Sequence, residues 1–132
     1  MYLSRILLTL LLALPLALSA QKLTVKYRFL NIEEGYDHTT KTAVFVDGEE
    51  MGISNPHPQS KPGSLIVDVP TGRHDIRVVN YALYEGTWEE HTVENQYSID
   101  CIVETVVRIK KKATIDVTFD LNSETSYTVK AK

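Results

Sequence analysis

The stretch from Tyr81 to Glu94 holds the residues best suited to recognise a ligand. Three aromatic side chains are interleaved there with four carboxylates, and the predicted site residues among them are Tyr81, Tyr84, Trp88, Glu85, Glu89 and Glu90. Aromatic rings offer flat apolar area at a low cost in side-chain entropy, and carboxylates accept hydrogen bonds from sugar hydroxyls or pair with basic groups. These six side chains are therefore predicted to form a surface that binds a protein or a glycan. In the competing interpretation Trp88 is a core residue and the glutamates solvate the other face of its strand.

The four histidines show no metal-site pattern. His38, His57, His74 and His91 are scattered singly and share no ligand spacing, so each is interpreted as a surface residue. The run from Asp47 to Glu50 lacks the repeated oxygen ligands of a calcium loop, and a hairpin turn explains it better. We therefore expect neither a metal nor another cofactor.

Nucleophilic catalysis has no recognisable frame in this chain. There is no Gly-x-Ser-x-Gly elbow and no glycine-rich phosphate loop. Because catalytic triads assemble across a fold, a small secreted hydrolase stays open as an alternative, but the sequence favours a protein without enzymatic activity. The single cysteine, Cys101, excludes an intrachain disulfide. It alternates with Ile99 and Val103, which predicts a buried thiol inside a strand.

A second candidate surface is the proline-rich segment from Ser54 to Ser64. Its three prolines and one glycine deny a strand its hydrogen-bond donors, so we expect an exposed loop. A stiff exposed loop over residues 55–63 is also what a small protease inhibitor would present, which gives a second alternative function.

The elements that must position these residues are predicted to be strands. Residues 22–30 alternate apolar and polar side chains with a period of two. Further strands are expected at 42–46, 65–69, 73–84, 87–94, 98–109, 113–121 and 127–129, and residues 49–53 are interpreted as the return arm of the hairpin that starts at 42–46. Because no helical spacing follows residue 20, the pattern predicts an all-β fold, an antiparallel immunoglobulin-like β-sandwich of seven or eight strands.

Three details of this arrangement are also predicted. Asp47-Gly48 is expected to form a tight hairpin turn, because glycine and aspartate tolerate positive φ angles. The alternation slips at Val78-Val79, which predicts either a bulge or a strand covered on both faces. The apolar stretch 98–109 is expected to be a central strand.

The first twenty residues predict export. Arg5 precedes the apolar run from Ile6 to Leu18, and small residues follow it up to Ala20, as in a cleaved signal peptide. We therefore expect a signal peptide over residues 1–20, cleaved after Ser19 or Ala20, and one domain over residues 21–132 in the secreted or periplasmic space. The run is too short to remain as a stable membrane span. Without Arg5, 13 basic residues remain against 17 acidic ones, which argues against a nucleic-acid partner.

The order of turns and strands between residues 44 and 78 adds a family resemblance. Val44 to Glu49 contains Asp-Gly, Gly52 follows, and after the strand 65–69 comes Pro70-x-Gly72-x-His74. This order resembles the PEGA-type β-sandwich repeat of bacterial surface and envelope proteins. The resemblance implies a non-enzymatic module with no catalytic residues. Together with the predicted signal peptide, it favours a secreted binding or structural module of the bacterial cell envelope. The sequence predicts no oligomeric state.

Overall fold

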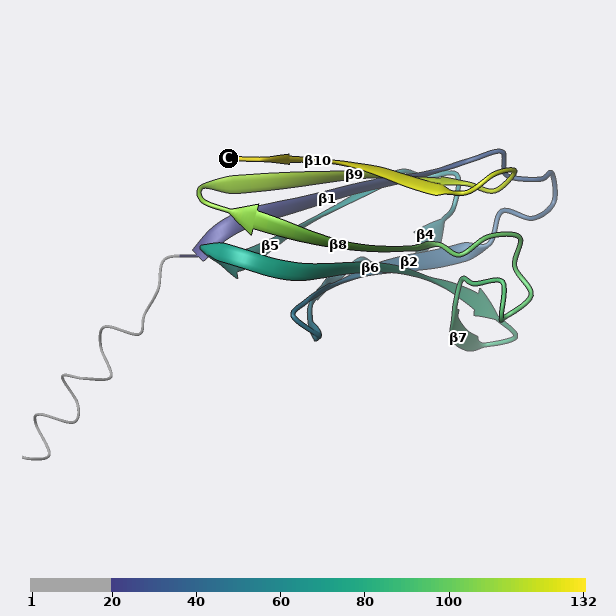
Figure 1. Cartoon of the computed structure of the whole chain (residues 1–132). Coiled ribbons are helices and arrows are strands. Elements are labelled where there is room, and N and C mark those ends of the chain that lie inside the picture. The colour runs from purple at the N-terminus through teal and green to yellow at the C-terminus, as the bar shows by residue number, and fades with distance from the viewer. Residues whose placement is uncertain (1–19) are drawn as a thin grey trace, which may run out of the picture.

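The computed structural model describes residues 20–132, which form ten strands and no helix. The strands are β1 (Ala20–Leu30), β2 (Thr39–Val46), β3 (Glu49–Ile53), β4 (His57–Pro58), β5 (Gly63–Pro70), β6 (Gly72–Tyr84), β7 (Thr87–Glu90), β8 (Ile102–Ile109), β9 (Lys112–Asp120) and β10 (Thr125–Ala131). They make two sheets that lie one above the other (Figure 1). The predicted all-β class is confirmed, with more strands than expected. The predicted signal peptide lies outside the described residues, apart from Ala20.

The first sheet has four strands in the order β10-β9-β1-β5. β1 pairs with β5 in antiparallel fashion but with β9 in parallel, from Lys22 opposite Lys112 to Leu30 opposite Asp120. The expectation of a wholly antiparallel arrangement is therefore wrong for this pair. The physical reason is that alternating inward and outward side chains look the same in parallel and antiparallel strands, so the pattern does not reveal strand direction.

The second sheet has β6 at its centre. Along one side β6 pairs with β2, and along the other it pairs first with β8 and then with β7. The short β4 pairs with β2, which also carries β3. The stretch 98–109 was expected to be central, and this is wrong, because β8 starts only at Ile102 and has β6 as its only neighbour within the described sheets.

The slip in alternation along β6 is explained by cover on both faces. Val78 and Val79 point to opposite sides of the sheet, and both have no exposed surface. The pairing of β6 with β2 and β8 runs through these two residues without a shift, so there is no bulge there. The register shift of this sheet lies instead between Val44 and Phe45, where β2 pairs with β3.

The core lies between the two sheets and is built from alternate residues. β1 contributes Leu23, Val25, Tyr27 and Phe29, and β9 contributes Ala113, Ile115, Val117 and Phe119. Opposite them, β2, β6 and β8 supply mainly valine and isoleucine. Cys101 is fully buried in this core, as expected, although it precedes β8 rather than lying within a strand.

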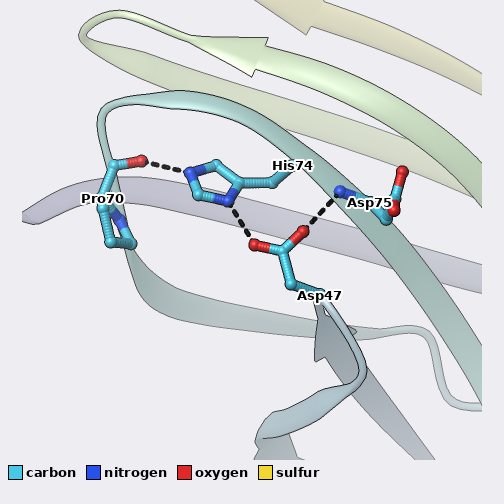
Figure 2. A network of polar contacts seen from close by, with 4 residues as sticks. All are labelled: Asp47, Pro70, His74 and Asp75. Carbon is cyan, nitrogen blue, oxygen red and sulfur yellow. Dashed lines mark hydrogen bonds and ion pairs between the residues drawn. The ribbon is translucent and has the colours of Figure 1, made fainter.

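The Asp47-Gly48 turn joins β2 to β3, with positive φ at both residues. The Asp47 carboxylate accepts hydrogen bonds from His74 Nδ1 at 2.6 Å and from the Asp75 backbone N–H at 2.9 Å (Figure 2). His74 Nε2 donates to the Pro70 carbonyl at 2.7 Å. A ring that donates from both nitrogens is an imidazolium, so the bond to Asp47 raises the pKa of His74 and lowers that of Asp47.

The proline-rich segment is held to the body of the protein at its middle. His57 and Pro58 form β4 against β2, and His57 Nε2 lies 2.9 Å from the Tyr27 hydroxyl. Gln59 is only 1% exposed, and its backbone N–H donates to the His38 carbonyl. The expectation of an exposed loop is therefore wrong for Gln59, which is buried, and for the strand formed by His57 and Pro58, although Pro58 itself is exposed. Proline removes a donor but leaves its carbonyl available, which permits this short pairing.

Within residues 20–132 no helix is long and apolar enough to span a bilayer.

Candidate ligand-binding site

A cleft of about 730 Å³ opens at one end of the two sheets. Its walls come from the β1–β2 connection, the β6–β7 hairpin, the segment that follows β7 and the β9–β10 turn, which gather at the same end of the molecule (Figure 1). Ligand pockets for small molecules are commonly of this size. The cleft is therefore large enough to hold a small organic ligand.

The inner face of the second sheet becomes polar as it approaches the cleft. Thr40, Thr42 and Asn80 occupy inward positions, the same face as Val44 and Val78, and all three are fully buried. Asn80 Nδ2 donates to the hydroxyls of both threonines, the one on Thr42 at 3.1 Å. A buried amide needs such partners, because an unpaired polar group in a core costs about 1–3 kcal/mol.

His91 joins this network to the cleft. Its ring is 2% exposed, it stacks on Phe29 with centroids 5.8 Å apart, and its Nδ1 lies 3.1 Å from Asn80 Oδ1. Burial, and to a smaller extent the nearby His38, lowers the pKa of His91 to about 4. The ring is therefore neutral at physiological pH. Because Nδ1 donates to Asn80, Nε2 is the acceptor nitrogen of a ring that lines the cleft.

Tyr97 and Glu89 form a second polar pair in the cleft wall. The Tyr97 hydroxyl donates to Glu89 Oε1 at 2.6 Å. Burial, then the bond to this carboxylate, raises the pKa of Tyr97, so the phenol stays protonated. The Tyr97 ring also lies 4.3 Å from His91 and 6.3 Å from His38, centroid to centroid. The cleft is thus lined by a continuous row of aromatic rings.

Gln59 lies in the same wall with its amide unpaired. Neither Oε1 nor Nε2 of this buried side chain has a hydrogen-bond partner within the described residues. Native proteins leave few such groups, and each one calls for an explanation, such as a water or a ligand that supplies the missing bonds. Both amide atoms are themselves buried, so a ligand in the cleft would reach them only if the Gln59 side chain turned towards it.

The structure brings only part of the predicted surface to this cleft. Tyr84 and Glu89 line it, whereas Tyr81, Trp88, Glu85 and Glu90 do not. Consecutive strand residues point to opposite faces, and directly paired residues share one face. The pairs Tyr81–Glu90 and Leu83–Trp88 therefore lie on the outer face of the hairpin, and Ala82–Glu89 on the inner face.

Trp88 belongs to a separate outer group. The indole is half-buried, and the Lys41 ammonium lies 4.3 Å from its ring centroid. Glu90 is 3.7 Å from the Arg77 guanidinium on the same face. Glu85 sits in the turn between β6 and β7, at a positive φ of 48°. These residues form a surface of their own, and the prediction that they bind a ligand remains a prediction.

Three residues of the cleft were missed in the sequence. His91 was interpreted as a surface residue, which is wrong, and Tyr97 and Gln59 were not singled out. β7 ends at Glu90, so the expected strand over 87–94 stops early. Asn80 was the signal in the sequence for a buried polar network, because it is a polar residue at an inward position of a long strand.

No three His, Cys, Asp or Glu side chains of residues 20–132 are grouped so that they could hold a metal ion.

Comparison with known proteins identifies no family for this chain. No family model and no curated protein matches the chain. Among solved structures, it is similar to a Gram-negative toxin and to pneumolysin, each with 10% identity and a TM-score of 0.36, and to listeriolysin O with 11% identity and a TM-score of 0.32. These matches cover 85%, 86% and 86% of this chain, which spans 23%, 24% and 22% of the three proteins. Scores this low indicate neither a shared fold family nor a shared activity.

Proposed function

We propose that this protein is a secreted, non-catalytic module of the bacterial cell envelope that binds a glycan in the end cleft. The observation that carries the proposal is the occurrence of the unpaired Gln59 amide and the neutral His91 ring in the wall of one cleft. Sugar hydroxyls both donate and accept hydrogen bonds, so they match an amide and an imidazole acceptor together. The exposed ring of Tyr84 at the rim supplies the flat apolar area on which a sugar ring stacks.

The shape of the site favours a glycan over a folded protein. A stable protein interface usually buries about 800 Å² on each partner, largely on flat surfaces. A cleft of about 730 Å³ has instead the size of sites that enclose a small molecule. We therefore propose a glycan as the ligand, and binding of a protein partner is an alternative that the experiments below test.

The proposed localisation is outside the cytoplasm, and export would depend on a signal peptide over residues 1–20. β1 begins at Ala20, which pairs with Pro70. Cleavage after Ser19 would keep this pair, and cleavage after Ala20 would remove only the end of the strand. Either cut leaves the two sheets intact. The measurement is the N-terminal sequence of the exported protein, and an uncleaved N-terminus would contradict the proposal.

Within this proposal the domain is an immunoglobulin-like sandwich of the PEGA type. The resemblance rests on Asp47-Gly48 and on the Pro70-x-Gly72-x-His74 turn, and the bond between His74 and Asp47 joins these two motifs (Figure 2). Such a bond gives a physical reason for the motifs to occur together, because it fixes one turn against the other. It supports a structural role for both motifs, with the ligand site at another place in the fold.

The experiment is a glycan array probed with the purified protein, followed by titration of each hit by NMR. Tyr84→Ala removes a ring that is 56% exposed at the cleft rim, and the matched control Tyr127→Ala removes one that is 43% exposed on β10. We expect Tyr84→Ala to weaken binding roughly three- to tenfold, the worth of one stacked ring, and Tyr127→Ala to leave it unchanged. An array without hits, or equal losses in both variants, would refute the proposed site.

One further variant separates the cleft from the outer face of the hairpin. Trp88→Ala removes the central ring of the surface predicted from sequence and leaves the cleft lining intact. If this variant abolishes binding and Tyr84→Ala does not, the ligand binds on the outer face. Stoichiometric inhibition in a protease panel, lost on shortening residues 55–63, would instead favour an inhibitor, and turnover of an array hit would favour a hydrolase.

A further inference from the structure

The charged side chains that line the cleft are carboxylates. Glu33, Glu89 and Glu94 line it, and neither lysine nor arginine is among its lining residues in the described chain. Two histidines also line it, and His91 is neutral because burial lowers its pKa to about 4. A site with this balance attracts cations and repels anions, since the field of several like charges adds inside a concave wall.

Glu89 is the carboxylate best placed to meet a bound group. It is half-buried on the inner face of the β6–β7 hairpin, and the Tyr97 hydroxyl fixes its position through Oε1. That bond uses one carboxylate oxygen, which leaves Oε2 to accept from a ligand. Partial burial also strengthens an ion pair formed there, because the surrounding dielectric is lower than in water.

The unpaired Gln59 amide is an independent sign that a polar ligand belongs here. Its side chain is 99% buried, and its donors and acceptor have no partner within the described residues. An ion alone would leave its amide donors unpaired. A ligand that carries hydroxyls as well as a positive charge would suit both Gln59 and Glu89.

We propose that the cleft selects a saccharide unit with a free amine, an amino sugar whose ammonium group pairs with Glu89. The hydroxyls of the same unit hydrogen-bond to Gln59 and to His91 Nε2. This inference rests on the proposed function, because it takes the ligand to be a glycan. It goes further in naming the class of sugar and in excluding acidic sugars, which the three carboxylates would repel.

The test compares two ligands that differ only at nitrogen, the β-1,4-linked trimer of glucosamine and the same trimer fully N-acetylated. Calorimetry at about pH 6, where the amine is charged, should show the glucosamine trimer binding about tenfold more tightly, the worth of one partly buried ion pair. At about pH 9, where the amine is largely neutral, the preference should disappear.

Two variants assign the preference to one residue. Glu89→Gln keeps an oxygen that accepts from Tyr97, so the wall stays in place while its charge is lost, and the two trimers should then bind equally. Glu85→Gln removes a carboxylate from the turn of the same hairpin, outside the cleft, and should retain the preference.

The outcomes distinguish this inference from the proposed function. Equal binding of the two trimers, a preference for the N-acetylated one, or array hits confined to acidic or neutral glycans would overturn amine selection while the glycan site stands. Failure of both trimers together with an empty array would overturn both. Binding of trilysine as tight as that of the glucosamine trimer would overturn the choice of a saccharide and indicate a basic protein partner.

Discussion

Titration of His91 tests the structure of the cleft without any ligand. The ordinary pKa of histidine is 6.5, and burial lowers that of His91 to about 4 in the folded protein. At about 1.4 kcal/mol for each pKa unit, this difference corresponds to roughly 3 kcal/mol of pH-dependent stability. As the pH falls, the unfolded chain binds a proton at His91 before the folded protein does. This contribution to the free energy of unfolding is therefore fully present above pH 6.5 and is lost as the pH falls towards 4.

The assay is urea unfolding of wild type and His91→Gln at a series of pH values. Glutamine stays neutral and keeps an amide that can donate to Asn80, so the variant should be less stable at neutral pH but less sensitive to acid. We expect the gap between the two proteins to shrink by about 3 kcal/mol between pH 7 and pH 4. His74 titrates in both proteins, so its contribution cancels in this comparison.

An NMR titration of the His91 ring protons gives the same answer without a variant. Parallel stability curves for wild type and His91→Gln would refute this reasoning. A His91 midpoint near 6.5, the ordinary value, would do so as well.

Three further predictions concern the rest of the fold. His74→Gln should remove a stabilisation that is present below pH 6.5 and lost as the pH rises through the raised pKa of His74, so the stability curves of wild type and variant should converge at alkaline pH. Gly63→Ala should cost about 1–3 kcal/mol in urea unfolding, because a Cβ there would overlap the buried Tyr27 hydroxyl, and Ser64→Ala is the matched control. Cys101 should resist alkylation until the protein is unfolded, since burial raises the pKa of its thiol, and Cys101→Ser should cost about 1–3 kcal/mol.

Much of the fold was predictable because each strand carries its own signal. Residues 22–30 and 113–121 alternate without a fault, and the structure has β1 and β9 there. Asp47-Gly48 specified its turn through positive φ angles. Strand partners were not predictable in the same way, since the inward residues of β1 would pack equally well beside a parallel or an antiparallel neighbour. The parallel pairing depends on where the chain enters each sheet, which is a property of the whole topology.

The candidate site was harder to predict, because its residues come from distant segments. In addition, residues that are adjacent in the sequence point to different faces of a strand. Glu89 and Glu90 are neighbours in the chain but lie on opposite faces of the hairpin. Gln59 lies in a proline-rich segment, where composition indicates exposure, yet it is buried directly after the pairing of β4 with β2. Local pattern therefore indicated the hairpin as a candidate but did not separate its two faces.

The polar inward residues link the stability of the fold to the existence of the cleft. An apolar residue in place of Asn80 would leave the His91 ring, which lines the cleft, without its hydrogen-bond partner. Asn80 instead connects both threonines to the imidazole, so burying the network requires every member to be in place. Loss of Asn80 would also remove the donor that the Thr42 hydroxyl accepts from. Under the proposed function, a His91 ring that is already held by this network lowers the entropic cost of binding a ligand in the cleft.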